Sequence, residues 1–91
     1  MRPYVQARRA AEAEVGAERF DPVEVFERDN WVCGLCGRGT DRTAVFPHPA
    51  SPSLDHIIPL ARRGEHTKAN TRCTHLICNL RKGDRPTVAE A

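Results

Sequence analysis

Four cysteines and a histidine carry the clearest chemical pattern in the sequence. Cys33 and Cys36 form a CxxC pair, and His75 and Cys78 repeat the two-residue gap downstream. Three thiolates and one imidazole at such spacing make a closed, tetrahedral zinc site. Cys73 offers an all-cysteine alternative to His75. We prefer His75, because its spacing to Cys78 mirrors that of the first pair. A thioredoxin-like redox pair is the rival interpretation of the CxxC, but it requires a βαβ context that the sequence lacks.

A carboxylate beside an imidazole, Asp55-His56, is the second group that suits chemistry. In metal-assisted hydrolysis the acid holds a cation and the histidine takes a proton from water, so activity falls at acidic pH. Taken alone, such a pair is more often an ordinary surface pair. Asn70 and Asn79 add amide oxygens downstream. Oxygen donors favour Mg²⁺ or Mn²⁺ over zinc, so a second, separate metal site is expected here.

The helices expected at the N-terminal end have composition and capping signals. Ala, Glu and Arg over residues 4–19 predict a helix. A second helix begins after Asp21 as N-cap, with Pro22 in its first position and a glutamate three residues after Asp21 to close a capping box. Val23 and Phe26 are expected on its buried face.

The elements expected to position the candidate ligands are shorter. Residues 31–32 and 54–58 are predicted to form short strands, and a second strand of the site is predicted over 71–75. A helix over 76–82, ended by a glycine, follows directly. The polar segment 62–69 is expected to be a loop.

The size and composition limit the class of protein. With 91 residues and 5% aromatic residues the chain forms one small domain whose thin core needs a staple such as a metal. Its longest apolar run has about three residues, which excludes a membrane span. No apolar signal-peptide segment is visible, so we expect a cytoplasmic protein in a reducing compartment, where thiols serve as metal ligands.

Charge is distributed unevenly along the chain. Residues 1–54 carry seven Lys or Arg against eight Asp or Glu, and residues 55–91 carry seven against four. A basic C-terminal half favours a polyanionic partner, since each Lys or Arg on a phosphate releases counterions. A solvated surface is the plainer interpretation of the same charges.

Taken together in order, these motifs resemble the HNH endonuclease family, in particular its small, stand-alone, zinc-stapled members of bacteriophages. The resemblance covers residues 21–85, with 1–20 as an N-terminal helical extension and 86–91 as a tail. Besides the CxxC pair, the motifs that carry it are Leu54-Asp55-His56-Ile57-Ile58-Pro59-Leu60, Gly64-x-His66, Asn70 and His75-x-x-Cys78-Asn79-x-x-Lys82-Gly83.

The resemblance implies an α+β fold, the ββα-metal or His-Me finger, with zinc knuckles and N-terminal helices. It implies that Asp55 ligates a catalytic Mg²⁺ or Mn²⁺ and that His56 is the general base. Asn70 would pin the loop between the strands and help to orient the base. Asn79 stands in place of the last histidine of the family name, a variant that many members share, and is expected to be the second metal ligand. His66 is expected to support either the residues of the catalytic site or the loop, and not to act as a catalyst.

The implied activity is hydrolysis of phosphodiester bonds in double-stranded DNA, by nicking with low sequence specificity, in a monomer or weak dimer. A link to phage DNA packaging through terminase subunits is a compatible expectation, in the cytoplasm of a bacterial host if the chain is phage-encoded. The main alternative is a non-catalytic, zinc-stabilised module that binds nucleic acid. Expected phosphate contacts are Arg62, Arg63, Lys68, Arg81, Lys82 and Arg85.

Overall fold

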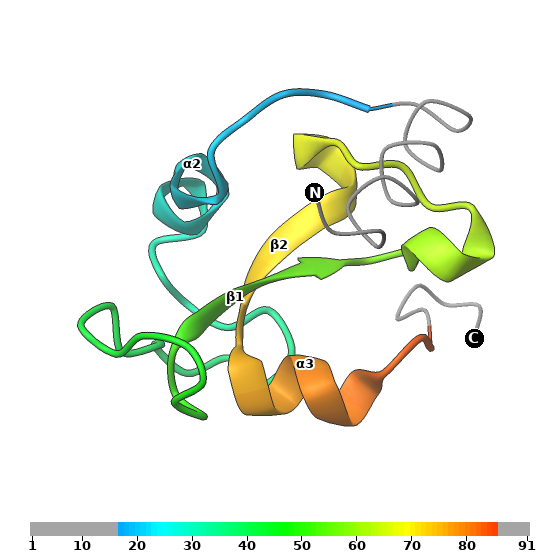
Figure 1. The fold of residues 1–91 in the computed structure, drawn as a ribbon. Coiled ribbons are helices and arrows are strands. Elements are labelled where there is room, and N and C mark those ends of the chain that lie inside the picture. The colour runs from blue at the N-terminus through cyan, green and yellow to red at the C-terminus, as the bar shows by residue number, and fades with distance from the viewer. Residues whose placement is uncertain (1–16, 86–91) are drawn as a thin grey trace, which may run out of the picture.

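The computed structural model describes residues 17–85, which form two short helices and a two-stranded antiparallel sheet (Figure 1). In chain order the elements are α2 (Pro22–Arg28), β1 (Pro52–His56), β2 (Thr71–His75) and α3 (Leu76–Lys82), with two single-turn 3-10 helices between the strands. The helix α3 follows β2 directly, so β1, β2 and α3 make a ββα unit, and α2 lies on the other side of the strands. This is the predicted α+β class and arrangement.

The helix α2 begins at the predicted cap. The Asp21 carboxylate accepts a hydrogen bond from the Val23 N–H at 3.0 Å, and the Asp21 N–H donates to the Glu24 carboxylate at 3.3 Å. With Pro22 in the first helical position, every part of the predicted capping box is confirmed. These bonds satisfy backbone donors that a helix of seven residues would otherwise leave exposed.

The chain turns sharply after α2. Asn30 and Trp31 both have left-handed backbones, with φ of 56° and 59°. The strand predicted over 31–32 is reduced to a single antiparallel bridge between Val32 and Gly39. The consecutive left-handed residues leave no room for an extended ladder, and the bridge instead closes the loop that contains Cys33.

The strands β1 and β2 pair in a defined register, in which Asp55 lies opposite Arg72 and His56 opposite Thr71. The bounds predicted for β2 are confirmed. The strand β1 begins and ends two residues earlier than predicted. It ends because the backbone of Ile58 is bonded to the side chain of Asn70, which takes the place of a ladder partner.

The connection between the strands is tighter than the expected polar loop. It contains the 3-10 turns η1 (Leu60–Arg62) and η2 (Lys68–Asn70). Between them Gly64 packs so closely on the carbonyl group of Ile58 that a Cβ at this position would overlap it. A glycine is therefore required where the two arms of this connection meet.

The buried residues are few, and five of them are polar or charged. In α2 the buried residues are Val25 and Phe26, whereas Val23, which was predicted to face the core, is 40% exposed. The orientation of a two-turn helix is set by its contacts with the strands, which sequence periodicity does not report. Within residues 17–85 the buried hydrophobic residues are Val25, Phe26, Cys33, Cys73 and Leu76, the buried polar residues are Ser51, Asp55, Thr71, Thr74 and Lys82, and Pro59 and Gly64 are buried as well.

Two further expectations concern an N-terminal helix and membrane spans. The helix predicted over 4–19 falls mostly outside the described residues, and residues 17–19 within them are not helical. Neither α2 nor α3, with seven residues each, approaches the roughly 20 residues that a helix needs to cross a bilayer.

Candidate functional site

Four potential metal ligands meet where the turn after α2 approaches the junction of β2 and α3. The ligand atoms of Cys33, Cys36, His75 and Cys78 all lie within 4.8 Å of one another. Nδ1 of His75 is 3.4 Å from Sγ of Cys36 and 3.8 Å from Sγ of Cys78. With zinc–sulfur bonds of about 2.3 Å and zinc–nitrogen bonds of about 2.0 Å, tetrahedral ligands are separated by about 3.5–3.8 Å. The cluster therefore has the dimensions of a structural zinc site.

The second nitrogen of His75 supports this geometry. Nε2 lies 3.0 Å from the carbonyl oxygen of Gly39, which can only accept a hydrogen bond. The proton of the neutral ring is therefore on Nε2, and Nδ1 is left with the lone pair that a metal requires.

Cys73 has different surroundings from the four clustered residues. Its side chain is fully buried, and its sulfur lies 4.0 Å from Oγ1 of Thr40. Burial raises the pKa of the Cys73 thiol, which favours the neutral form. Cys73 thus behaves as a small apolar residue of β2, and the geometry favours His75 as the fourth ligand.

Two thiols of the cluster have pKa values that are shifted in opposite directions. Burial raises the pKa of the Cys33 thiol, but hydrogen bonds from the backbone of His75, Cys36 and Leu35 outweigh it and lower the pKa to about 6. Burial and the neighbouring sulfur of Cys33 raise the pKa of Cys78 to about 11. Adjacent thiolates repel each other, and a divalent cation among them removes that repulsion.

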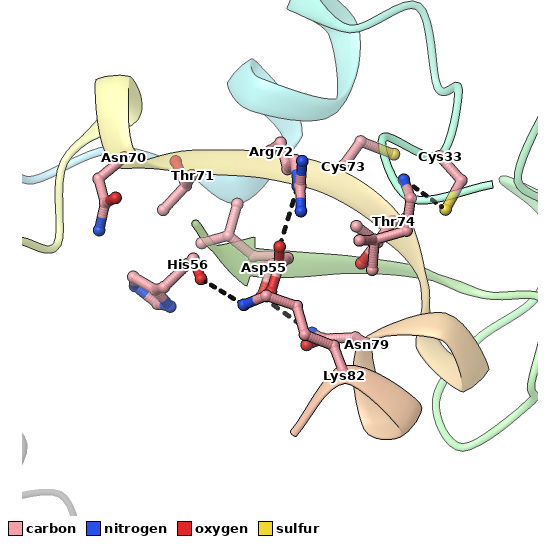
Figure 2. A network of polar contacts seen from close by, with 12 residues as sticks. Cys33, Asp55, His56, Asn70, Thr71, Arg72, Cys73, Thr74, Asn79 and Lys82 are labelled. Carbon is pink, nitrogen blue, oxygen red and sulfur yellow. Dashed lines mark hydrogen bonds and ion pairs between the residues drawn. The ribbon is translucent and has the colours of Figure 1, made fainter. Parts of the chain in front are cut away.

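The second site is organised around the buried carboxylate of Asp55, which is 2% exposed. Figure 2 shows this carboxylate between two cations, Arg72 from β2 and Lys82 from α3. Nε of Arg72 lies 2.9 Å from Oδ2, and Nζ of Lys82 lies 3.0 Å from Oδ1. The Lys82 ammonium also donates to the carbonyl oxygen of His56 at 2.8 Å. The charge of Asp55 is therefore compensated by residues of the chain itself.

Asn79 lies beside this carboxylate on α3. Its side-chain nitrogen donates to Oγ of Ser53 at 2.9 Å and to the carbonyl oxygen of Leu54 at 3.2 Å. Because a carbonyl oxygen only accepts, these bonds fix the orientation of the amide, and Oδ1 is the end that remains to face a ligand.

Asn79, Asp55 and His56 line one cavity of about 180 Å³, together with Lys82. Amide and carboxylate oxygens are the donors that Mg²⁺ or Mn²⁺ prefers, so the donor set fits such a cation. The carboxylate has about four lone-pair positions and accepts one hydrogen bond on each oxygen from the two cations. A divalent cation at Oδ1 would compete with the Lys82 ammonium.

His56 follows Asp55 at the end of β1, with its ring directed away from the Asp55 carboxylate (Figure 2). Nε2 of His56 lies 3.0 Å from Nδ1 of His66. His66 was expected to support either the site residues or the loop, and the structure brings its ring into direct contact with that of His56.

Asn70 fastens the loop between the strands, as its motif position implies. Its Oδ1 accepts from the N–H of Ile58 at 3.0 Å, and its Nδ2 donates to the carbonyl oxygens of Ile58 at 3.0 Å and Glu65 at 2.7 Å. Both ends of the amide are used, so Asn70 has a geometry suited to holding the loop and none suited to binding a cation.

The six residues expected to contact phosphates differ in their exposure. Lys82 differs from the expectation, because its ammonium is buried against Asp55 and is unavailable to DNA. Lys68 is partly exposed and pairs with Glu24 at 2.8 Å. Exposed on the surface are Arg62, Arg63, Arg81 and Arg85.

The sequence interpretation missed three contributors to the site: Arg72, the inward side chain of Lys82, and the contact of Phe20 with His66, whose rings stack with centroids 4.8 Å apart. Only Arg72 had a usable signal. Pairing the two predicted strands through their polar residues would have placed it opposite Asp55.

Comparison with known proteins gave one match. A family model described as HNH endonuclease matches residues 33–85, more than half of the chain. A comparison with curated proteins and one with solved structures found no significant match.

Proposed function

Because this chain belongs to the HNH endonuclease family, we propose that it is a metal-dependent endonuclease that hydrolyses phosphodiester bonds of double-stranded DNA. The observation that carries the proposal is the meeting of Asp55, His56 and Asn79 on one open cavity. In the family motif these positions supply the two metal ligands and the base. The zinc-type cluster lies apart from this cavity and has no open position, which supports a structural role for it.

The chain's own residues would divide the chemistry as follows. His56 accepts a proton from the attacking water, which requires a neutral imidazole. Asp55 and Asn79 hold the catalytic divalent cation through oxygen atoms. That cation, when bound, stabilises the negative charge that develops on the phosphate and on the departing 3′ oxygen. Asn70 keeps the loop that follows His56 fixed on the end of β1.

DNA would be held mainly through its backbone, since no recognition helix with base-reading side chains is evident among residues 17–85. This supports low sequence specificity. One site per chain supports nicking by a monomer or weak dimer. The proposed phosphate contacts are Arg62, Arg63, Lys68, Arg81 and Arg85.

A plasmid nicking assay tests the proposal. Purified, zinc-loaded protein is incubated with supercoiled plasmid and Mg²⁺ or Mn²⁺, beside the variants His56→Ala and His48→Ala. His48 is an exposed histidine whose ring accepts a bond from its own loop, at the Ala50 N–H. We expect nicked circles from wild type and His48→Ala, and a loss of at least about 100-fold with His56→Ala. Equal rates for all three proteins, or no nicking by any, would refute the proposal.

A non-catalytic, zinc-stabilised module that binds nucleic acid is the second candidate. The ion pairs of Asp55 with Arg72 and Lys82 favour it, because they neutralise the carboxylate without a metal. Tight binding of plasmid without nicking in any divalent cation would identify this function.

A role in phage DNA packaging within a bacterial cytoplasm is a finer proposal. It rests on the resemblance to small phage members of the family. Co-purification with a terminase subunit, and faster nicking in its presence, is the expected result. The absence of both association and stimulation would contradict this proposal.

A further inference from the structure

We propose that His66 is a positioning residue for His56, and that the segment 17–20, which precedes the family-matched region, holds His66 in place. The inference rests on the proposed function, since it assigns a role in orienting the proposed base. Nε2 of His56 and Nδ1 of His66 are 3.0 Å apart, and the two rings lie with centroids 5.2 Å apart at 38°. This is the distance of an ordinary N–H···N hydrogen bond.

The direction of this bond follows from the tautomers. A neutral imidazole in water prefers the proton on Nε2. If His56 donates from Nε2 to Nδ1 of His66, both rings have this preferred tautomer. The reverse direction would require the less favourable Nδ1–H form in both rings. On this ground we infer that the proton of His56 lies on Nε2, which puts the basic lone pair on its Nδ1.

His66 is itself held from the N-terminal side. Its ring stacks on Phe20 with centroids 4.8 Å apart and planes at 20°. Its carbonyl oxygen accepts from the N–H of Glu18 at 2.8 Å, and Ala17 pairs with it in a parallel bridge. The Glu18 carboxylate accepts from the N–H of Lys68 at 2.8 Å. Segment 17–20 thus binds both the backbone and the ring of the loop residue that meets His56.

This arrangement makes the distant segment part of the catalytic support. A loop that only connected the strands would not need an aromatic ring stacked on one of its histidines. Asn70 already fixes the backbone of this loop at Ile58 and at Glu65, the residue before His66. The Phe20–His66 stack therefore adds orientation of a ring, which backbone bonds do not supply.

The decisive experiment is nuclear magnetic resonance of the zinc-loaded full chain, labelled with ¹⁵N in its histidines and free of other divalent cations. At a pH well above the ordinary imidazole pKa of about 6.5, we expect a scalar coupling between Nε2 of His56 and Nδ1 of His66, with the proton on Nε2 of His56. Absence of that coupling, or a proton on Nδ1 of His66, would overturn the proposal. This readout does not depend on nuclease activity, so it also decides the matter if the chain does not cut DNA.

Kinetics supply the second readout. His66→Ala should lower kcat for nicking about 10–100-fold with KM for DNA within about twofold, as expected for loss of an orienting partner. His66→Asn, whose amide oxygen can accept from the same N–H, should recover most of the rate, and Phe20→Leu should lower kcat in the same sense. His48→Ala is the matched control and keeps the wild-type rate. Equal kcat for His66→Ala and wild type would count against the proposal, as would a loss that His66→Asn does not repair.

Discussion

The ammonium of Lys82 lies 3.0 Å from Oδ1 of Asp55, and the side chains of both residues are almost completely buried. The pair joins the last residue of α3 to the penultimate residue of β1. The same ammonium binds the carbonyl oxygen of His56. A single lysine therefore ties the helix that carries Asn79 to the strand that carries the proposed base.

Removing this lysine should destabilise the fold. In Lys82→Met the carboxylate of Asp55 stays buried with Arg72 as its remaining cation, and breaking a buried pair typically costs about 3–5 kcal/mol. We expect a decrease of about 3 kcal/mol in the free energy of unfolding, measured by denaturant titration of the zinc-loaded protein. Arg81→Met, at the exposed neighbouring position, should change it by less than about 0.5 kcal/mol. Equal effects of the two variants would contradict a buried pair.

Zinc content should follow the geometry of the cluster. Cys78→Ser and His75→Ala should lose stoichiometric zinc and unfold at room temperature, since binding of structural zinc supplies about 10 kcal/mol or more of folding free energy. Cys73→Ala should retain one zinc per chain, because its sulfur faces Thr40. Elemental analysis with circular dichroism measures both effects. Zinc lost from Cys73→Ala and kept by His75→Ala would assign the fourth ligand to Cys73.

Zinc binding should release protons. In the metal-free cluster at neutral pH the Cys33 thiol, with a pKa of about 6, is already a thiolate, whereas Cys78, with a pKa of about 11, is protonated. Zinc binds thiolates only, so the bound state holds fewer protons and its affinity falls as the pH is lowered. The fall should steepen below about pH 6, where Cys33 also becomes protonated. Calorimetry in buffers of different ionisation enthalpy measures the protons released, and a pH-independent affinity would contradict the assignment.

Two glycines offer a matched test of the loop between the strands. Gly64→Ala places a methyl group against the backbone carbonyl of Ile58, which cannot move aside without disturbing the fold. In Gly39→Ala the methyl group meets no atom within 4 Å. Overpacking of this kind costs about 1–3 kcal/mol. Thermal unfolding of the zinc-loaded variants should show a lowered Tm for Gly64→Ala and little change for Gly39→Ala. A Tm for Gly64→Ala at the wild-type value would contradict the close packing of Gly64 on Ile58.

The exposed arginines should set the salt dependence of DNA binding. Each phosphate contact that is lost should reduce the slope of log K against log salt by about one unit. Arg63→Ala and Arg81→Ala are expected to do so, as measured by fluorescence anisotropy over a salt series. Arg42→Ala, which removes a guanidinium stacked over Trp31, is the control and should leave the slope unchanged. Identical slopes in all variants would exclude Arg63 and Arg81 as phosphate contacts.

Local signals in the sequence predicted several elements well. The cap at Asp21, the bounds of β2 and the span of α3 depend on short-range chemistry, and all three are confirmed. The grouping of Cys33, Cys36, His75 and Cys78 followed from a repeated gap of two residues.

Other features depend on where side chains go after the elements pack. Lys82 was expected on the surface, because a lysine near a helix end usually reaches solvent, yet a long apolar stem lets its ammonium reach Asp55. The stack of Phe20 on His66 joins residues far apart in the chain, and no periodic pattern reports it. The proposed role of residues 17–20 could therefore not be predicted from the sequence.

Cys78 and Asn79 are consecutive residues of α3, and a helix turns its side chains by about 100° from one residue to the next. One flank of this short helix thus presents sulfur and the next presents oxygen. Soft, thiophilic cations are drawn to the first and hard cations to the second. In the proposed function this single turn of helix supplies one ligand to each metal, and an excess of Mg²⁺ would not take the place of a zinc held by thiolates.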